Sequence, residues 1–400
     1  MYLQLFNCLF RSIYFLLFTY TEEQLDEHII YCCESLRNVN ILYIKIFQAI
    51  SMNTSITSQT ISNYLMTFND NVPFKQDDID MHKLKYNLQI HNIDLVTERP
   101  VASGSIAYVF KGIFNDKYVA IKVKRNDIEK TLQNSIDDLR FLFRLLNIIP
   151  SFSRTNALTT LESNIDYLFE QCNFVNEWEN IQYIYQRNKT NNKFIVPQPH
   201  CNDLVHLHEI IVMDWVDGVN INELNNEDKH NVFNLLVGYG IKSMFFDGYV
   251  HGDLHQGNCK YGTNGTLVIY DFGMICKLTN TEVDAIYKFC QLLFTGDVNN
   301  CVRFMLSNGL THKDGQPILY PSTFATSELT TWFTKIIDRV PLNIIYPDIN
   351  VFTNILSKYE LISVNWFNKI LLSMAINESL TTSLQTDTTY FECAKKYIIK

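Results

Sequence analysis

Glycine and proline are scarce in this chain, at 14 and 9 of 400 residues. This composition excludes a collagen-like chain and a disordered chain rich in proline and glycine. Basic residues are also outnumbered, because 33 Lys and Arg face 42 Asp and Glu and leave a formal net charge of −9. Since a general nucleic-acid-binding protein needs a basic surface, we expect no nucleic-acid partner.

The chain has no CxxC motif, although it contains ten cysteines. Cysteines without paired spacing argue against a zinc ribbon and against a disulfide framework. Scattered cysteines usually act as small buried apolar residues, so we expect free thiols, a reducing compartment and a cytoplasmic protein. With 47% apolar residues the chain can bury a large core, and its length leaves room for two lobes or domains.

Residues 1–20 are strongly apolar, and only Arg11 brings a charge into them. The stretch is about as long as the roughly 20 residues that span a bilayer, but a central charge makes insertion costly. It has no basic start and no small-residue cleavage site, unlike a secretory signal peptide. A packed or interfacial helix is the favoured interpretation, and a membrane anchor is the alternative.

The hydrophobic periodicity changes near residue 95. Apolar residues recur at helical spacing over residues 22–68, including a second helix near 41–52, whereas residues 69–94 are polar and irregular. Strict alternation then predicts a β-hairpin of strands 107–114 and 118–123. The remaining predicted elements are helices at 127–149 and 157–188, a strand at 208–215, a mostly helical segment from 231 and a short strand at 267–270.

Three short segments carry recognisable chemistry. The first joins a small-residue turn to Lys122, the second is His-Gly-Asp-Leu-His-Gln-Gly-Asn over residues 251–258, and the third is Tyr-Asp-Phe-Gly over residues 270–273. Each alone is weak, but their order and spacing match the parts of a phosphoryl-transfer site. We therefore expect ATP and Mg²⁺ as cofactors.

Each part of this pattern has its own physical role. Lys122 can neutralise the phosphates, Asp253 can accept the proton of the attacking hydroxyl, and Asn258 and Asp271 offer oxygen ligands to Mg²⁺. Backbone N–H groups of the turn can cradle phosphate oxygens. The nucleotide-binding residues expected besides Lys122 are Val101, Ala102, Ser103, Gly104, Ser105 and Val109 in and after the turn, and Met213 and Trp215 at a hinge that would meet the adenine.

His251 and His255 are four residues apart and could be metal ligands. Because no third ligand pattern accompanies them, we favour a bracing role for His251 in the catalytic loop, like that of the histidine in the kinase H-R-D motif.

These residues together resemble the UbiB-type atypical kinases, a protein-kinase-like family linked to ubiquinone biosynthesis. The matching segments are Lys45-Ile-Phe-Gln48 for the KxGQ motif, Ala102–Ser105 for the alanine-rich loop, Val119–Lys122 for VAxK, Phe246–Asn258 for the catalytic loop and Tyr270–Gly273 for the magnesium loop.

The resemblance implies a two-lobed, protein-kinase-like α+β fold. Its expected parts are an N-terminal helical extension (1–95), an N-lobe containing a small antiparallel sheet and inserted helices (96–216), and a helical C-lobe (217–400). It also implies that Glu177 pairs with Lys122, with Glu170 and Glu179 as alternative partners.

The chain departs from the family pattern in a segment expected to regulate access to the nucleotide. The family's E-x-D acids, which meet the KxGQ segment, are here the amides Gln171 and Asn173, and Phe47 stands at the glycine of KxGQ. Amides keep the hydrogen-bonding shape but remove two negative charges. The resemblance therefore assigns Lys45, Gln48, Gln171 and Asn173 to a regulatory contact that is loosened in this chain.

Three functions remain open at this point. The first is an active kinase or ATPase of the UbiB type, since no catalytic part is missing. The second is a small-molecule kinase of the aminoglycoside or choline kinase type, whose catalytic loop resembles residues 251–258. The third is a nucleotide-binding regulatory pseudokinase. Besides the nucleotide, a lipid or isoprenoid-type ligand or a membrane surface is a candidate partner, the last through residues 1–20.

Overall fold

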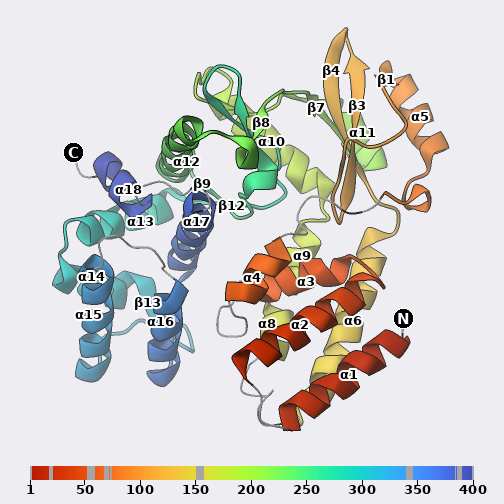
Figure 1. The fold of residues 1–400 in the computed structure, drawn as a ribbon. Helices are drawn as coiled ribbons and strands as arrows, with labels where there is room; N and C mark the ends of the chain where they lie inside the picture. Colours follow the sequence, from red (N-terminus) through yellow and green to blue (C-terminus); the bar gives the residue numbers. More distant parts are fainter. Residues whose placement is uncertain are drawn as a thin grey trace. The chain divides into compact units, whose positions relative to one another are not determined.

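The chain forms two compact units in the computed structural model (Figure 1). Unit 1 comprises Met1–Glu179 and Gln198–Trp215, and unit 2 comprises Asn180–Pro197 and Val216–Lys400. The predicted division at residues 95 and 216 remains a prediction. The structure describes residues 2–17, 21–51, 59–66, 72, 74–149, 157–338, 346–382, 384 and 390–398.

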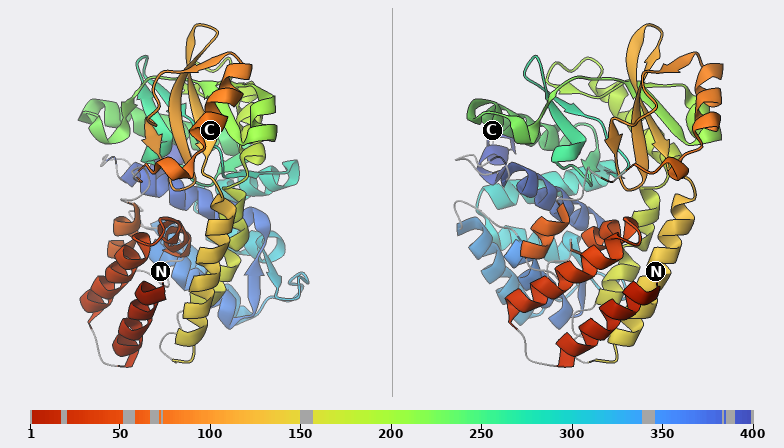
Figure 2. Two further views of the ribbon diagram at one scale, coloured as in Figure 1. Left: turned by 90° about the vertical axis from the view of Figure 1, so that its right-hand side faces the viewer. Right: turned by 45° about the vertical axis from the view of Figure 1, so that its right-hand side comes forward.

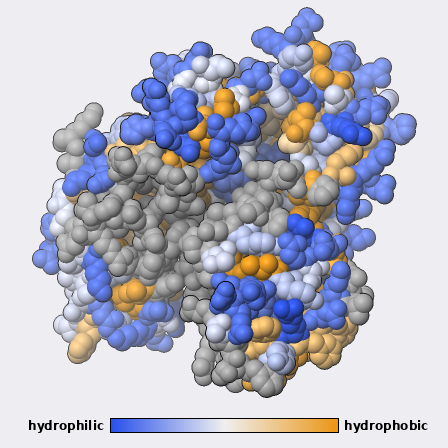
Figure 3. Space-filling view, in the orientation of Figure 1, coloured by the Kyte–Doolittle hydropathy of each residue, from blue (hydrophilic) through white to orange (hydrophobic). Residues whose placement is uncertain are grey.

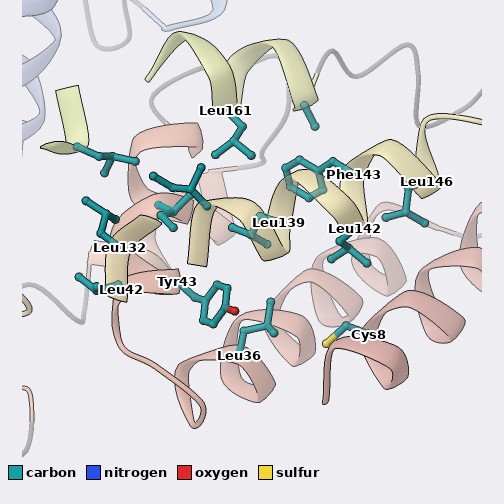
Figure 4. Close-up of a cluster of buried hydrophobic side chains, with 14 of the residues drawn as sticks. Cys8, Leu36, Leu42, Tyr43, Leu132, Leu139, Leu142, Phe143, Leu146 and Leu161 are labelled. Atoms are coloured by element: carbon teal, nitrogen blue, oxygen red, sulfur yellow. The ribbon is translucent and has the colours of Figure 1, made fainter. Parts of the chain in front are cut away.

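The helices of unit 1 pack around one amphipathic helix, α6 (Ile128–Leu146). Its apolar residues recur every three or four positions, so one face can enter a core. Figure 4 shows this face meeting side chains of the N-terminal helices, among them Tyr43 and Leu36. The other helices around this core are α1 (Tyr2–Leu17), α2 (Glu22–Arg37), α3 (Leu42–Ser51), α8 (Ala157–Ser163) and α9 (Ile165–Glu170). Helix α4 (Gln59–Met66) packs on α2 and α3 in a separate apolar cluster.

Helix α1 lies beside α2 and α6, as the red and yellow ribbons of Figure 2 show. It buries Cys8 and Leu9 in the core, so the prediction of a packed helix is confirmed. Its outer face exposes a row of large side chains, which comprises Phe6, Phe10, Tyr14 and Leu17. Figure 3 shows patches of hydrophobic surface over the N-terminal helices. Across the described ranges, no helix has the length and apolarity needed to cross a membrane.

An antiparallel sheet completes unit 1, with strand order β1-β3-β4-β7-β6 and β2 paired to β3. The predicted hairpin is confirmed as β3 (Ala107–Phe114) and β4 (Lys117–Lys124), joined at Asn115 and Asp116, which both have positive φ as a tight hairpin turn requires. The shorter strands are β1 (Ile93–Leu95), β2 (Ala102–Ser103), β6 (Pro199–His200) and β7 (Ile210–Asp214).

Helix α10 (Phe174–Asn188) begins in unit 1 and ends in unit 2. Unit 2 is otherwise mainly helical, with one four-stranded sheet of order β5-β11-β10-β8 and the strand pairs β12-β9 and β13-β14. Its helices are α12 (Asn226–Phe245), α13 (Asn280–Phe294), α14 (Val298–Phe304), α15 (Thr323–Asp338), α16 (Tyr346–Lys358), α17 (Asn365–Thr382) and α18 (Tyr390–Ile398). Its strands are β5 (Phe194–Ile195), β8 (Val219–Asn220), β9 (Tyr249–His251), β10 (Cys259–Gly262), β11 (Thr266–Ile269), β12 (Ile275–Lys277), β13 (Leu310–His312) and β14 (Leu361–Ser363).

The prediction of irregular structure over residues 69–94 was wrong, because helix α5 (Met81–Ile90) lies there. Asp80 caps its first turn, and Leu84 and Leu88 are buried against the sheet. Met81, Leu84 and Leu88 do recur at helical spacing, but the helix has only ten residues, so its stability comes mainly from these tertiary contacts.

Two predicted boundaries also shift. His208 belongs to helix α11 (Asn202–His208), so the strand predicted from residue 208 begins at Ile210. Helix α12 begins at Asn226 and not near 231, because the side chain of Asn225 caps it by accepting the N–H of Asp228.

Candidate active site

Lys122 and Glu177 form a buried ion pair in unit 1. Lys122 lies on β4 opposite Val109, and its Nζ donates to Oε1 of Glu177 at 2.6 Å. The Glu177 side chain is 1% exposed and that of Lys122 is 15% exposed. Glu170 instead accepts the side-chain amide of Asn176, and Glu179 is exposed, so the structure places Glu177 on Lys122.

The small-residue turn is fixed by the strands and by an arginine. The N–H of Val101 donates to the carbonyl of Val109 at 2.7 Å, and that of Gly104 donates to Ala107 at 2.9 Å. Nη2 of Arg125 donates to the carbonyl of Gly104 at 2.6 Å. The hydroxyl of Ser103 donates to the carbonyl of Val72.

Arg125 is itself held in a buried network. Its Nη1 donates to Oδ2 of Asp78 at 2.6 Å, and the hydroxyl of Tyr108 donates to the same oxygen at 2.8 Å. The guanidinium also lies over the Tyr108 ring, 4.2 Å from its centroid. The sequence pattern does not reveal this network, because 47 positions separate Asp78 from Arg125. The network connects the turn to the segment before α5.

The predicted hinge lies at the end of β7. Met213 is buried and pairs with Ala120 on β4 and with Pro199 on β6. The N–H of Trp215 donates to the carbonyl of Tyr118 at 3.0 Å, so this N–H is used within unit 1. The ring of Trp215 lies over Nζ of Lys111 at 4.5 Å.

In unit 2, His251 joins the catalytic loop to the magnesium loop. Its Nε2 donates to the carbonyl of Asp271 at 2.8 Å, and its Nδ1 accepts the N–H of Asp253 at 3.3 Å. Burial lowers the pKa of His251 and outweighs the neighbouring carboxylates, so the imidazole is neutral with its proton on Nε2. These contacts support the bracing role, which remains a prediction. Among the described residues, no group of three His, Cys, Asp or Glu side chains could hold a metal ion.

Asn258 and Asp271 are oriented as oxygen donors. Nδ2 of Asn258 donates to the carbonyl of Asp253 at 2.8 Å, which leaves the amide oxygen as the acceptor on this side chain. Oδ1 of Asp271 accepts the N–H of Gly273 at 3.1 Å, which fixes the rotamer of the carboxylate. One amide oxygen and one carboxylate are ligands that Mg²⁺ prefers, so these residues fit the ion.

Of the residues predicted to form the regulatory contact, Lys45 lies near the segment of Gln171 and Asn173, but the two amides have other surroundings. Lys45 on α3 lies close enough to Cys172 to oppose the burial that raises the pKa of this thiol to about 11. Asn173 has a different contact, since its Oδ1 accepts the N–H of Asn176 at 3.0 Å at the start of α10. Nε2 of Gln171 is buried without a hydrogen-bond partner. The side chain of Gln48 lies outside the described residues.

Phe47, at the glycine position of KxGQ, is accommodated by packing. It is half-buried against two apolar clusters, one around α6 and one formed by α2, α3 and α4. The phenyl ring therefore fills space between helices of the extension.

Residues 84–305 match the model of the ABC1 atypical kinase-like domain, which is more than half of the chain. The chain belongs to this family. The resemblance to UbiB-type kinases is thereby confirmed, and the protein-kinase-like α+β fold with it. The assignment of individual site residues remains a prediction, supported by the contacts described above.

Named relatives agree with this assignment. An uncharacterized protein from the hydrogenase 1 5′ region of Clostridium pasteurianum is 29% identical over 282 residues, covering 67% of this chain and 52% of the relative. An uncharacterized chloroplastic aarF domain-containing protein kinase of Arabidopsis thaliana is 23% identical, covering 86% and 49%. A probable protein kinase UbiB of Pseudomonas aeruginosa is 23% identical, covering 69% and 54%. The chain spans about half the length of these curated relatives.

A solved structure shares the fold. Rv3197 from Mycobacterium tuberculosis, in a complex with erythromycin, superposes with a TM-score of 0.54 at 14% identity, covering 94% of this chain and 98% of that one.

The buried ion pair yields a stability prediction. Glu177→Gln leaves the Lys122 ammonium without its carboxylate, and breaking a buried pair in this way costs about 3–5 kcal/mol. Urea denaturation of the full chain should show this loss. Glu179→Gln, on the exposed side of the same helix, should change stability by less than about 0.5 kcal/mol. Equal effects of the two substitutions would contradict the pairing.

Proposed function

We propose that this chain binds ATP with Mg²⁺ and transfers or hydrolyses its terminal phosphoryl group. The observation that supports this most is the position of His251, which contacts the N–H of Asp253 and the carbonyl of Asp271 at once. A neutral side chain thereby holds a carboxylate base and a metal ligand in one arrangement without adding charge. Family membership makes such an arrangement meaningful, since a buried histidine alone is common.

The residues of unit 2 would carry the transfer. Asp253 accepts the proton of the attacking hydroxyl or water, and a base so placed is worth about 10²–10⁴ in rate. Asn258 and Asp271 hold Mg²⁺, which when bound screens the charge that develops on the phosphoryl oxygens. Asn258 has a second role, because its amide fixes the Asp253 backbone.

The residues of unit 1 would hold the nucleotide. Lys122 neutralises charge on the α- and β-phosphates, and Glu177 keeps its ammonium in place. The N–H groups of Val101 and Gly104 are bonded to Val109 and Ala107, so the phosphates would be bound by the other N–H groups of the turn over residues 101–105. Arg125 fixes this turn through the carbonyl of Gly104.

The two alternative functions have less support than an active kinase or ATPase of this family. A small-molecule kinase of the aminoglycoside or choline kinase type rests on the catalytic-loop sequence alone, whereas the family match extends across residues 84–305. A pseudokinase rests on Gln171, Asn173 and Phe47, none of which is among the residues that hold Asp253 or Asp271. Nucleotide turnover by the purified chain separates the pseudokinase from an active enzyme, and a panel of hydroxylated small molecules tests the other alternative.

We also propose that the acceptor or activator is apolar and that the protein contacts a membrane surface peripherally from the cytoplasm. The support is the exposed row on α1, in which Phe6, Phe10 and Tyr14 are 51%, 67% and 61% exposed. Aromatic side chains on one face of a helix are typical of helices that lie in a membrane interface. Turnover in the presence of lipid vesicles belongs in the same assay.

Magnesium-dependent nucleotide binding should require Asp271. Asp271→Asn keeps the shape of the side chain but removes the charge of the ligand, so affinity for ATP in Mg²⁺ should fall toward the metal-free value. Calorimetry with and without Mg²⁺ measures this. Asp284→Asn, at an exposed position of the same unit, is the matched control. Unchanged binding in the Asp271→Asn protein would refute the metal assignment.

Asp253 should affect turnover and leave binding nearly unchanged. Asp253→Asn removes the base, so turnover should drop by about 10²–10⁴, while calorimetry should report near-native ATP affinity because Lys122, the turn and Mg²⁺ are intact. The assay is run with and without lipid vesicles. Equal turnover of both proteins would favour a non-catalytic role for this loop.

The amides at 171 and 173 should loosen a contact with Lys45. A lysine facing carboxylates forms hydrogen bonds roughly twice as strong as those to neutral groups. Gln171→Glu with Asn173→Asp should therefore slow nucleotide exchange, and Lys45→Ala should cancel the effect. Aspartate also caps helices well, so the start of α10 should survive the change. Stopped-flow release of a fluorescent nucleotide measures the exchange rate. Absence of coupling in this double-mutant cycle would refute the contact between Lys45 and positions 171 and 173.

A further inference from the structure

We infer that Asn180 positions the magnesium loop, in addition to the residues assigned above. This inference rests on the proposed function, because it concerns the backbone that carries Asp271. Asn180 lies on α10, and its Nδ2 donates to the carbonyl of Phe272 at 3.1 Å. The two residues belong to the same unit although 92 positions separate them in the sequence.

Packing alone does not account for an asparagine at this position. Asn180 is 1% exposed and Phe272 is 0% exposed, so the amide is surrounded by protein. Its Oδ1 is buried without a hydrogen-bond partner. An unsatisfied buried polar atom costs about 1–3 kcal/mol, which an apolar side chain of similar size would avoid. The hydrogen bond to the carbonyl of Phe272 is the interaction that offsets this cost.

Asn180 and His251 together fix two consecutive carbonyls of the magnesium loop. His251 donates to the carbonyl of Asp271 from β9, and Asn180 donates to the carbonyl of Phe272 from α10. The Asp271 carboxylate accepts the N–H of Gly273 directly after them. With both carbonyls held, the peptide between Asp271 and Phe272 cannot rotate without losing a hydrogen bond. The backbone that carries the Asp271 carboxylate is therefore held from outside the loop, and Gly273 holds the carboxylate itself from within it.

Helix α10 contributes to both sets of site residues. Glu177 precedes Asn180 by three positions, which places them on neighbouring parts of one helical face. Glu177 orients Lys122, and Asn180 orients the backbone at Asp271.

The test compares two buried asparagines of the same helix. Asn188 is 3% exposed, and its Nδ2 donates at 3.0 Å to Ile184 within α10, so it shares the burial of Asn180 but has no contact with the loop. In Asn180→Asp, the Mg²⁺ concentration for half-maximal ATP binding should rise about threefold to tenfold, the range expected for one lost hydrogen bond. ATP affinity without Mg²⁺ should not change. Asn188→Asp should leave both quantities as in the natural protein.

Hydrogen exchange without nucleotide provides a second readout. Exchange of amides over residues 270–277 should be faster in Asn180→Asp than in Asn188→Asp, because only the first substitution releases the loop. Asn180→Ala replaces the aspartate variant if the latter does not fold. Equal magnesium dependence or equal loop exchange in the 180 and 188 variants would overturn the inference. If the natural protein binds no Mg²⁺-nucleotide, the proposed function fails, and the exchange comparison alone decides the role of Asn180.

Discussion

The candidate site depends on placing charged groups where water is largely excluded. Glu177 is 1% exposed, and a buried carboxylate persists as an anion only if a cation and hydrogen bonds compensate it. Lys122 supplies that cation, so the pair fixes α10 against β4 in unit 1. The start of α10 and strand β4 are therefore held together within unit 1 by one buried charge pair.

The parts predicted correctly from the sequence are those encoded locally. Alternation over residues 107–123 identified the hairpin, because one face of each strand is buried and a shift of one residue would expose it. The order of short motifs identified the family, whereas the roles of Lys122, Asp253 and Asp271 remain predictions. By contrast, helix α5 was missed, since its stability comes from Leu84 and Leu88 against a sheet formed later in the chain.

The contacts that position the motifs could not be predicted in the same way. Arg125 reaches Asp78 across 47 positions, and Asn180 reaches Phe272 across 92. A single arginine after a strand or an asparagine inside a helix is ordinary in sequence, and its partner becomes visible only in the folded chain. Resemblance can also leave out a local role. Asn173 was assigned by resemblance to a regulatory contact, and in the structure its side chain caps α10.

These positioning contacts share a chemical property that suits a phosphate site. His251 is neutral, Asn180 and Asn258 are amides, and each acts on backbone carbonyls or N–H groups and not on another charge. Arg125 brings a charge, but Asp78 neutralises it within hydrogen-bonding distance. In unit 2, neutral supports add no charge beside Asp253 and Asp271. The loops are thus fixed in place without altering the charge balance on which nucleotide and metal binding would depend.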